Sequence, residues 1–181
     1  LTETELVFDK AGRVIDAHPA DSSYPHTIIE MFMVAANEAV ASLLDRLNVP
    51  FMRRIHPEPD SLTMKNLAQY VRALGFGMSK TADRYAVQDL IAAAKNKDCG
   101  LGVNMLVLRS FERAVYSPLR IGHYALASAN YCHFTSPIRR YADLLVHRLL
   151  EQYLQTGSVN SPESEDRLDE LGKHMTLTEE I

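Results

Sequence analysis

Residues 134–148 read FTSPIRRYADLLVHR, and this stretch predicts where the chain enters a helix. Ser136 suits an N-cap and Pro137 suits the first helical position, because the φ angle of proline matches a helix and its missing N–H would lack a partner there. We therefore expect a helix from about residue 137. Its first turn would carry Arg139 and Arg140, which the positive end of the helix dipole disfavours. Either both guanidinium groups point into solvent, or they bind an anion together with the free N–H groups of the helix terminus.

The charged residues are unevenly distributed along the 181-residue chain, whose net charge is −4. Residues 1–108 have a net charge of −2, residues 109–150 of +4 and residues 151–181 of −6. All the basic residues of the middle segment are arginines, which favours planar, bidentate contacts to phosphate or carboxylate groups. Composition alone leaves structural ion pairs as an equally good explanation of these arginines.

Length and composition indicate a globular protein, since 46% of the residues are hydrophobic and can form a core. No run of apolar residues approaches a membrane span, and the first residues have neither the basic nor the apolar region of a signal peptide, so we expect a cytoplasmic location and no membrane contact. The two cysteines, Cys99 and Cys132, are expected to be reduced, packed thiols. Because the first residue is Leu1 and not methionine, we expect a piece of a larger protein.

Turn residues and hydrophobic periodicity predict short strands among several helices. LVFDKAGRVIDAH (6–18) predicts a hairpin around DKAG, and VPFMRRIHPEP (49–59) predicts another short strand. Residues 26–47 have apolar side chains on nearly every face, which predicts a long, largely buried helix. Further helices are predicted over 61–76, with Ser61 as cap and Gly75 as stop, and over 81–100, closed by Gly100. A helix over 103–118 is predicted to break at Pro118, and residues 121–137 are predicted to be extended.

One narrow stripe of the long helix is polar and contains His26, Glu30 and Asn37. Carboxylates are rarely buried without a partner, so a glutamate between Ile29 and Met31 needs an ion pair or a polar cavity. Two interpretations of Glu30 stay open. It forms a salt bridge to an arginine at the edge of the core, or it lines a polar channel.

Two other kinds of site receive little support from the sequence. His123, Cys132, His133 and His147 are potential zinc ligands, but no pair has the spacing of a zinc knuckle. Ser136 near His133 suggests a nucleophile with its base, but no G-x-S-x-G elbow surrounds the serine, and N-capping already explains it. No Walker loop, dinucleotide fingerprint or DxD cluster is present either, so the chain alone holds no complete catalytic apparatus.

Four stretches of the chain resemble the ribonuclease II/ribonuclease R (RNB) family. They are HTIIEMFMVAANEAV (26–40), LRSFERAVYSP (108–118), GHYALAS (122–128) and YCHFTSPIRRYADLLVHR (131–148). The resemblance runs from about residue 1 to residue 155 and implies a processive, magnesium-dependent exoribonuclease that degrades single-stranded RNA from its 3′ end to nucleoside 5′-monophosphates. It also implies a mixed α+β catalytic domain, helix-rich in this portion with short antiparallel strands, flanked by OB-type RNA-binding domains.

The resemblance also assigns roles to individual residues. Arg139 would be the essential arginine at the scissile end of the RNA, and Glu30 would contact the sugar of the terminal nucleotides. The same wall of the site would contain His133, Thr135, Ser136 and Arg140 as RNA-binding residues.

Spacing within the predicted helix suggests how Arg139 is held. Asp143 follows Arg139 by four residues, and His147 follows Asp143 by four. Residues with this spacing are neighbours on a helix surface, so we expect these pairs to fix the arginine.

The chain departs from the family where the magnesium ligands are concerned. In the family these are a tight aspartate cluster upstream of the matched region, whereas Asp9, Asp16 and Asp21 are scattered here, and the family's aromatic clamp is also missing. We therefore expect no metal ligand in this chain and no activity from the chain alone.

The resemblance also suggests how the chain is organised. Residues 1–155 would be the C-terminal part of an RNB catalytic domain. Residues 156–181 would be a linker and a truncated helix that lead toward a missing OB-type domain. The alternative to an enzyme is a non-catalytic RNA-binding or interaction fragment derived from the same family.

Overall fold

The computed structural model describes residues 4–19, 23–78 and 83–179, and the chain divides into two compact units. The first unit comprises residues 1–35 and the second comprises residues 36–181. The division falls inside helix α1 (Tyr24–Arg46). The mixed, helix-rich α+β fold with short antiparallel strands is confirmed.

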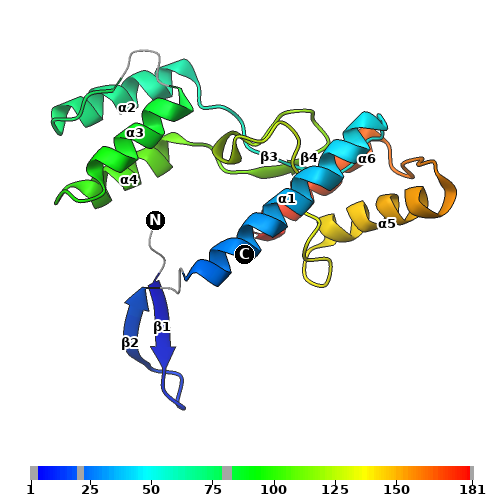
Figure 1. The fold of residues 1–181 in the computed structure, drawn as a ribbon, viewed down its shortest axis with the longest axis horizontal. Coiled ribbons are helices and arrows are strands. Elements are labelled where there is room, and N and C mark those ends of the chain that lie inside the picture. The colour runs from blue at the N-terminus through cyan, green and yellow to red at the C-terminus, as the bar shows by residue number, and fades with distance from the viewer. Residues whose placement is uncertain (1–3, 20–22, 79–82, 180–181) are drawn as a thin grey trace. The chain divides into compact units, whose positions relative to one another are not determined.

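A β-hairpin begins the first unit (Figure 1). Strand β1 (Thr4–Phe8) pairs antiparallel with strand β2 (Val14–Pro19). In the connecting turn, Asp9 Oδ1 accepts hydrogen bonds from the N–H groups of Ala11 and Arg13, at 2.8 and 2.9 Å. A short acidic side chain that bonds to the backbone just after it stabilises tight turns, so the prediction of a hairpin around DKAG is confirmed.

Helix α1 confirms the long helix predicted from residue 26, but the predicted burial is wrong. Its buried residues are Asn37, Ala41 and Leu44, whereas Ile29 and Phe32 in its first half are 55% and 72% exposed. A helix that is apolar on all sides needs neighbours on all sides. The described residues of this chain supply such neighbours only to the second half of the helix.

Among the described residues, α1 is the one helix that is long and apolar enough to cross a membrane. Its most apolar 18-residue segment has a mean hydropathy of 1.5, so the expectation that no segment approaches this composition is wrong. A core helix of a soluble protein has the same composition. The hydrogen bonds of buried Asn37 within this chain are those of a helix that packs against protein.

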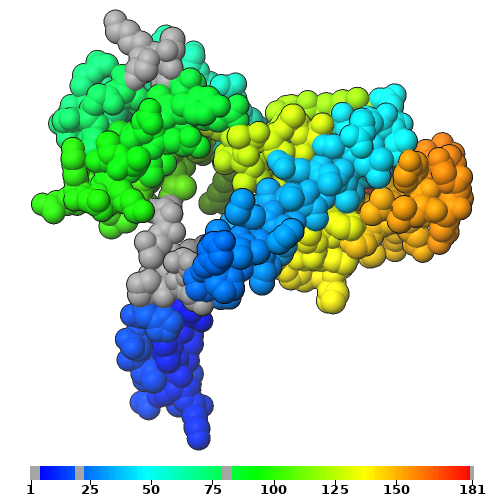
Figure 2. Space-filling model, viewed as in Figure 1, coloured from blue at the N-terminus to red at the C-terminus, as the bar shows by residue number. Residues whose placement is uncertain are grey.

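Three helices of the second unit pack around one apolar core. They are α2 (Ser61–Ala73), α3 (Arg84–Ala94) and α4 (Gly100–Ser110), and Figure 2 shows their side chains together, coloured from cyan-green to green. The buried side chains at the centre of this group are those of Met64, Leu67, Val71, Val87, Leu90, Val103 and Val107.

Two details of these helices differ from the predictions. The cap of α2 is Asp60 and not Ser61, because the Asp60 carboxylate accepts hydrogen bonds from the N–H groups of both Leu62 and Thr63. Gly100 does not close α3, which ends at Ala94, but begins α4. A Cβ atom at this position would collide with the Ala94 carbonyl oxygen, so glycine allows α4 to start close to the end of α3.

A short two-stranded sheet connects the three helices with the remainder of the second unit. Strand β3 (Arg53–Ile55) confirms the strand predicted within 49–59 and pairs antiparallel with β4 (Val115–Ser117). The helix predicted over 103–118 is therefore wrong in its second half, since α4 ends at Ser110. Pairing with β3 decides the conformation of 115–117, and periodicity within one segment does not contain this information.

Helices α5 (Tyr141–Thr156) and α6 (Glu165–Glu179) complete the second unit. Helix α6 packs against β4, where Gly172 lies so close to the Tyr116 carbonyl group that a Cβ atom would overlap it. Residues 121–137 contain no α-helix, as predicted, but they are extended only in part: a 3₁₀ turn at Tyr124–Leu126, a left-handed Ala127 and bends at 129–130 and 135 interrupt them.

Candidate functional site

The segment before α5 is a turn and not the first turn of a helix. Helix α5 begins at Tyr141, so the predicted start at residue 137 and the predicted capping by Ser136 are both wrong. The N–H groups of Arg139 and Arg140 donate to the Ser136 carbonyl group, at 3.3 and 3.2 Å. The chain then straightens at Arg140 before it enters the helix. The two arginines thus precede the first turn of the helix, and Arg140 occupies its N-cap position.

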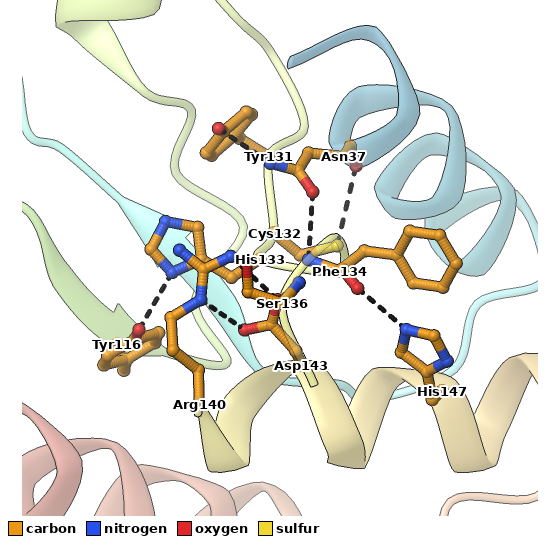
Figure 3. A network of polar contacts seen from close by, with 10 residues as sticks. All are labelled: Asn37, Tyr116, Tyr131, Cys132, His133, Phe134, Ser136, Arg140, Asp143 and His147. Carbon is orange, nitrogen blue, oxygen red and sulfur yellow. Dashed lines mark hydrogen bonds and ion pairs between the residues drawn. The ribbon is translucent and has the colours of Figure 1, made fainter. Parts of the chain in front are cut away.

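Asp143 explains why the turn replaces a helical start. Its carboxylate lies in the first turn of α5, where a negative charge is favourable, and its side chain is fully buried. Its Oδ1 atom accepts a hydrogen bond of 2.7 Å from the Ser136 N–H group. Both oxygens also accept from the Arg140 guanidinium group, Oδ2 from Nε and Oδ1 from Nη2, each at 2.8 Å (Figure 3).

The two arginines therefore have different environments. Arg140 is half-buried and paired with Asp143, three residues later, so the predicted pairing of Asp143 with Arg139 is wrong. The Arg139 side chain is exposed and forms no hydrogen bond or ion pair with any residue that the structure describes. Of the two guanidinium groups, the one on Arg139 has all its donors available for a ligand.

His133 forms a neighbouring part of this site. Its Nδ1 atom and the Tyr116 hydroxyl group share a hydrogen bond of 2.8 Å. Burial, and after it the positive charge of Arg140, lowers the pKa of His133 to about 4. His133 is therefore neutral at pH 7 and offers a hydrogen bond but no charge to a ligand. Thr135 is half-buried, and its hydroxyl group has no hydrogen-bond partner in the described part of the chain.

Asn37 of α1 fixes the backbone of the extended segment from the other side (Figure 3). Its Oδ1 atom accepts a hydrogen bond of 2.9 Å from the Phe134 N–H group, and its Nδ2 group donates to the Tyr131 hydroxyl oxygen at 2.9 Å. The Asn37 carbonyl group accepts from the Cys132 thiol at 3.5 Å. The polar stripe on the helix pointed to Asn37, but the sequence did not reveal its partners.

His147 also binds this segment. Its spacing from Asp143 had suggested a pair between those two residues, and that prediction is wrong. Its Nε2 atom lies 2.7 Å from the Phe134 carbonyl oxygen, and its ring stacks on the Phe134 ring with the centroids 4.2 Å apart. Phe134 is thus held at its N–H group by α1 and at its carbonyl group by α5. The backbone that leads to the arginines is fixed by two helices.

A cavity of about 290 Å³ adjoins the turn. It is lined by Tyr116, Arg139, Arg140, Tyr141, Met175 and Glu179, among others. Glu179 is paired with Arg54 across a distance of 2.7 Å, so its negative charge is compensated. The cavity can therefore accommodate an anion or a sugar beside the two arginines.

Comparison with known proteins identifies the family. The model of the RNB domain matches residues 1–156. This chain belongs to the RNB family. The RNB match includes the turn with Arg139 and Arg140 as well as Glu30.

Several of its relatives and structural neighbours are ribonucleases R. The chain is 39% identical to ribonuclease R of Thermotoga maritima and 36% identical to that of Aquifex aeolicus, over 99% and 100% of its length. It spans 26% of the length of each of these relatives. The structure of Mycoplasma genitalium RNase R in complex with ribose-methylated single-stranded RNA superimposes with a TM-score of 0.85 at 29% identity, covering 99% of this chain and 29% of that one.

The fold also occurs outside the ribonucleases R. The structure of yeast Ssd1, a pseudonuclease, superimposes with a TM-score of 0.76 at 24% identity and covers 88% of this chain and 20% of that one. At this identity the similarity concerns the fold alone. An RNB fold therefore does not by itself establish catalysis.

Glu30 lies in the first unit of this RNB chain, whereas the other predicted site residues lie in the second. Its side chain is exposed and has no ion pair with a described residue, so the salt-bridge interpretation finds no support here. Its contact with a sugar stays a prediction.

The described residues of the RNB chain contain no group of three or more His, Cys, Asp or Glu side chains that could hold a metal ion. Asp21, one of the scattered aspartates, lies outside the described residues.

Cys132 is buried, which raises the pKa of its thiol to about 12, and it is not in a disulfide. His123 stacks on His56 with ring centroids 5.2 Å apart, and burial lowers its pKa to about 4.

Proposed function

We propose that this RNB chain supplies the phosphate-binding wall of a processive 3′-to-5′ exoribonuclease, which hydrolyses single-stranded RNA to nucleoside 5′-monophosphates. The observation that carries the proposal is the contrast between the two arginines. Arg140 is held by Asp143, whereas Arg139 is exposed and no described residue uses its donors. The proposal is supported by the relatives named ribonuclease R and by the single-stranded RNA in the Mycoplasma genitalium complex.

Arg139 is the catalytic residue of this proposal. A guanidinium group binds phosphate oxygens through two parallel hydrogen bonds, and it stabilises the negative charge that develops during phosphodiester hydrolysis. Because no described residue competes for its donors, Arg139 binds the scissile phosphate without first breaking an ion pair. Arg140 retains the N–H donors that Asp143 does not use, and these face the same ligand.

The uncharged groups of the wall bind the RNA beside that phosphate. The hydroxyl groups of Thr135 and Ser136 can donate to phosphate oxygens, and neutral His133 can hydrogen-bond to a sugar or phosphate. Glu30 accepts hydrogen bonds from the sugar hydroxyl groups of the terminal nucleotides in this proposal. Its carboxylate is exposed and has no ion pair with a described residue, which is consistent with that role.

Magnesium belongs to this proposal as the cofactor of the whole enzyme. The described residues do not fit the ion, because they contain no carboxylate cluster. Its ligands would come from the remainder of the catalytic domain, and the residues of this chain account for phosphate and sugar binding. Further partners in the proposal are the N-terminal half of that domain and the OB-type RNA-binding domains, in a cytoplasmic enzyme.

A non-catalytic RNA-binding protein is the second candidate. This alternative stays open because the described residues of this chain contain no carboxylate cluster for a metal ion. The two candidates agree about RNA binding and differ about hydrolysis. Only a measurement of hydrolysis separates them.

The test uses the full-length protein and a 5′-labelled single-stranded oligoribonucleotide with magnesium. The enzyme proposal expects release of nucleoside 5′-monophosphates from the 3′ end. The 181-residue chain alone is expected to release none, because its described residues contain no carboxylate cluster. Binding of the RNA by the full-length protein without any product would favour the second candidate, and mononucleotide release by the pure 181-residue chain would contradict the expected division of the site.

A further inference from the structure

The Asp143 carboxylate joins the two ends of the turn that carries Arg139. It accepts the backbone N–H group of Ser136, at the start of the turn, and the guanidinium group of Arg140, at its end (Figure 3). These three hydrogen bonds measure 2.7 to 2.8 Å. One side chain thus closes the segment 136–140.

Burial shows that this carboxylate is a component of the turn and not a surface group. The Asp143 side chain is 0% exposed. A buried charge is unfavourable unless it is paired and fully hydrogen-bonded, and replacing a whole buried ion pair by apolar side chains of similar volume often leaves the stability unchanged. The specific property that the carboxylate adds is therefore the geometry it imposes on its two partners.

The backbone of the turn determines where the Arg139 side chain begins. No described residue holds the Arg139 guanidinium group, so its position depends on the turn. Inside the turn, the hydrogen bonds to the Ser136 carbonyl group are long, at 3.2 and 3.3 Å. The shorter bonds to Asp143 are the stronger restraint.

We propose that Asp143 is a positioning residue that acts through Arg139. It holds the 136–140 turn closed and so aims the free guanidinium group at the scissile phosphate. This inference rests on the proposed function for its catalytic consequence, whereas the restraint on the turn can be measured independently.

Asp143→Asn is the informative substitution. The amide keeps the size of the side chain and one acceptor oxygen, but its NH₂ group cannot accept a hydrogen bond. It therefore cannot bind Ser136 and both Arg140 donors at once. Asp45→Asn is the control, because the partly exposed Asp45 carboxylate also pairs with an arginine, buried Arg53, at 2.6 Å and outside the turn.

The first measurement is amide hydrogen exchange in the full-length protein, over peptides that cover residues 134–141. We expect exchange there to be several-fold faster in Asp143→Asn than in the parent protein, because local opening becomes easier. In Asp45→Asn it should stay at the parental rate. Equal exchange of these peptides in the two variants would overturn the proposed restraint.

The second measurement is a double-mutant cycle on RNA hydrolysis. Asp143→Asn should lower kcat by about tenfold or more with little change in KM, while Asp45→Asn should change kcat by less than about twofold. In an Arg139→Ala background, Asp143→Asn should have almost no further effect, because residues that act as a unit are not additive.

The outcomes of the cycle separate this inference from the proposed function. If Asp143→Asn lowers kcat by the same factor with and without Arg139, Asp143 does not act through Arg139 and the inference is wrong. If the parent protein hydrolyses no RNA, the proposed function fails. Hydrogen exchange then still decides whether Asp143 restrains the turn.

Discussion

Arg139→Ala separates stability from activity most sharply in this protein. The Arg139 side chain is exposed and has no described partner, so its removal leaves no buried group without a hydrogen bond. Surface substitutions of this kind change the free energy of unfolding by about 0.5 kcal/mol or less. In a domain of this size that corresponds to a change in Tm of about 2 °C at most.

The effect of Arg139→Ala on hydrolysis should be large. Removal of one donor that stabilises the transition state lowers kcat by roughly a hundredfold to a thousandfold. Arg140 cannot replace it, because Asp143 holds its Nε and one of its Nη groups. Arg139→Lys should restore activity only in part, since the ammonium group keeps the charge but loses the planar pair of donors.

Single-turnover hydrolysis of a labelled oligoribonucleotide by the full-length protein measures this prediction. Thermal unfolding and RNA binding are measured on the same preparations, and binding should weaken less than hydrolysis. The control is Arg167→Ala, since Arg167 is an exposed arginine on α6 that pairs with Glu170. If Arg139→Ala unfolds the protein, or hydrolyses RNA at nearly the parental rate, Arg139 is not the catalytic arginine.

Three further changes test the surroundings of the site. Arg140→Ala leaves the buried Asp143 carboxylate without its cation and should destabilise the protein by about 3 kcal/mol, measured by urea unfolding. Arg139→Ala, by contrast, should leave the stability almost unchanged. Between pH 6.5 and pH 4 the unfolded chain binds a proton at His133 that the folded protein does not bind, because burial and the charge of Arg140 lower the pKa of that residue to about 4. The free energy of unfolding should therefore fall as the pH is lowered through this range, and it should fall less steeply in the His133→Asn variant than in the parent protein. Equal slopes of the two curves would contradict the prediction. Asn37→Ala leaves the Phe134 N–H group without its acceptor and should lower the free energy of unfolding by about 1–3 kcal/mol. An unchanged free energy of unfolding would contradict the prediction and indicate that water replaces the amide.

The sequence predicted those features that depend on neighbouring residues. The hairpin around DKAG is confirmed. So are the helices predicted over 61–76 and 81–100, observed over 61–73 and 84–94, and the strand predicted within 49–59, observed at 53–55, because turn residues and periodicity act over a few positions. The family was also evident from local motifs, above all from HFTSPIRRYADL. Two interpretations of the sequence were wrong because they depend on contacts with distant residues. Strand β4 forms at 115–117 by pairing with β3, whereas the first half of α1 is not covered by described residues of this chain.

The candidate site shows the same limit more clearly. The sequence by itself placed Arg139 and Arg140 next to each other and close to Asp143, but it assigned the wrong arginine to the carboxylate. Ideal helical spacing predicts the pair four residues apart, and that spacing applies only where the backbone is helical. The tertiary structure buries the Asp143 carboxylate, and a buried carboxylate must find enough donors to replace water. It obtains them from Ser136 and Arg140 by holding the chain in a turn before α5, which leaves Arg139 free for a ligand.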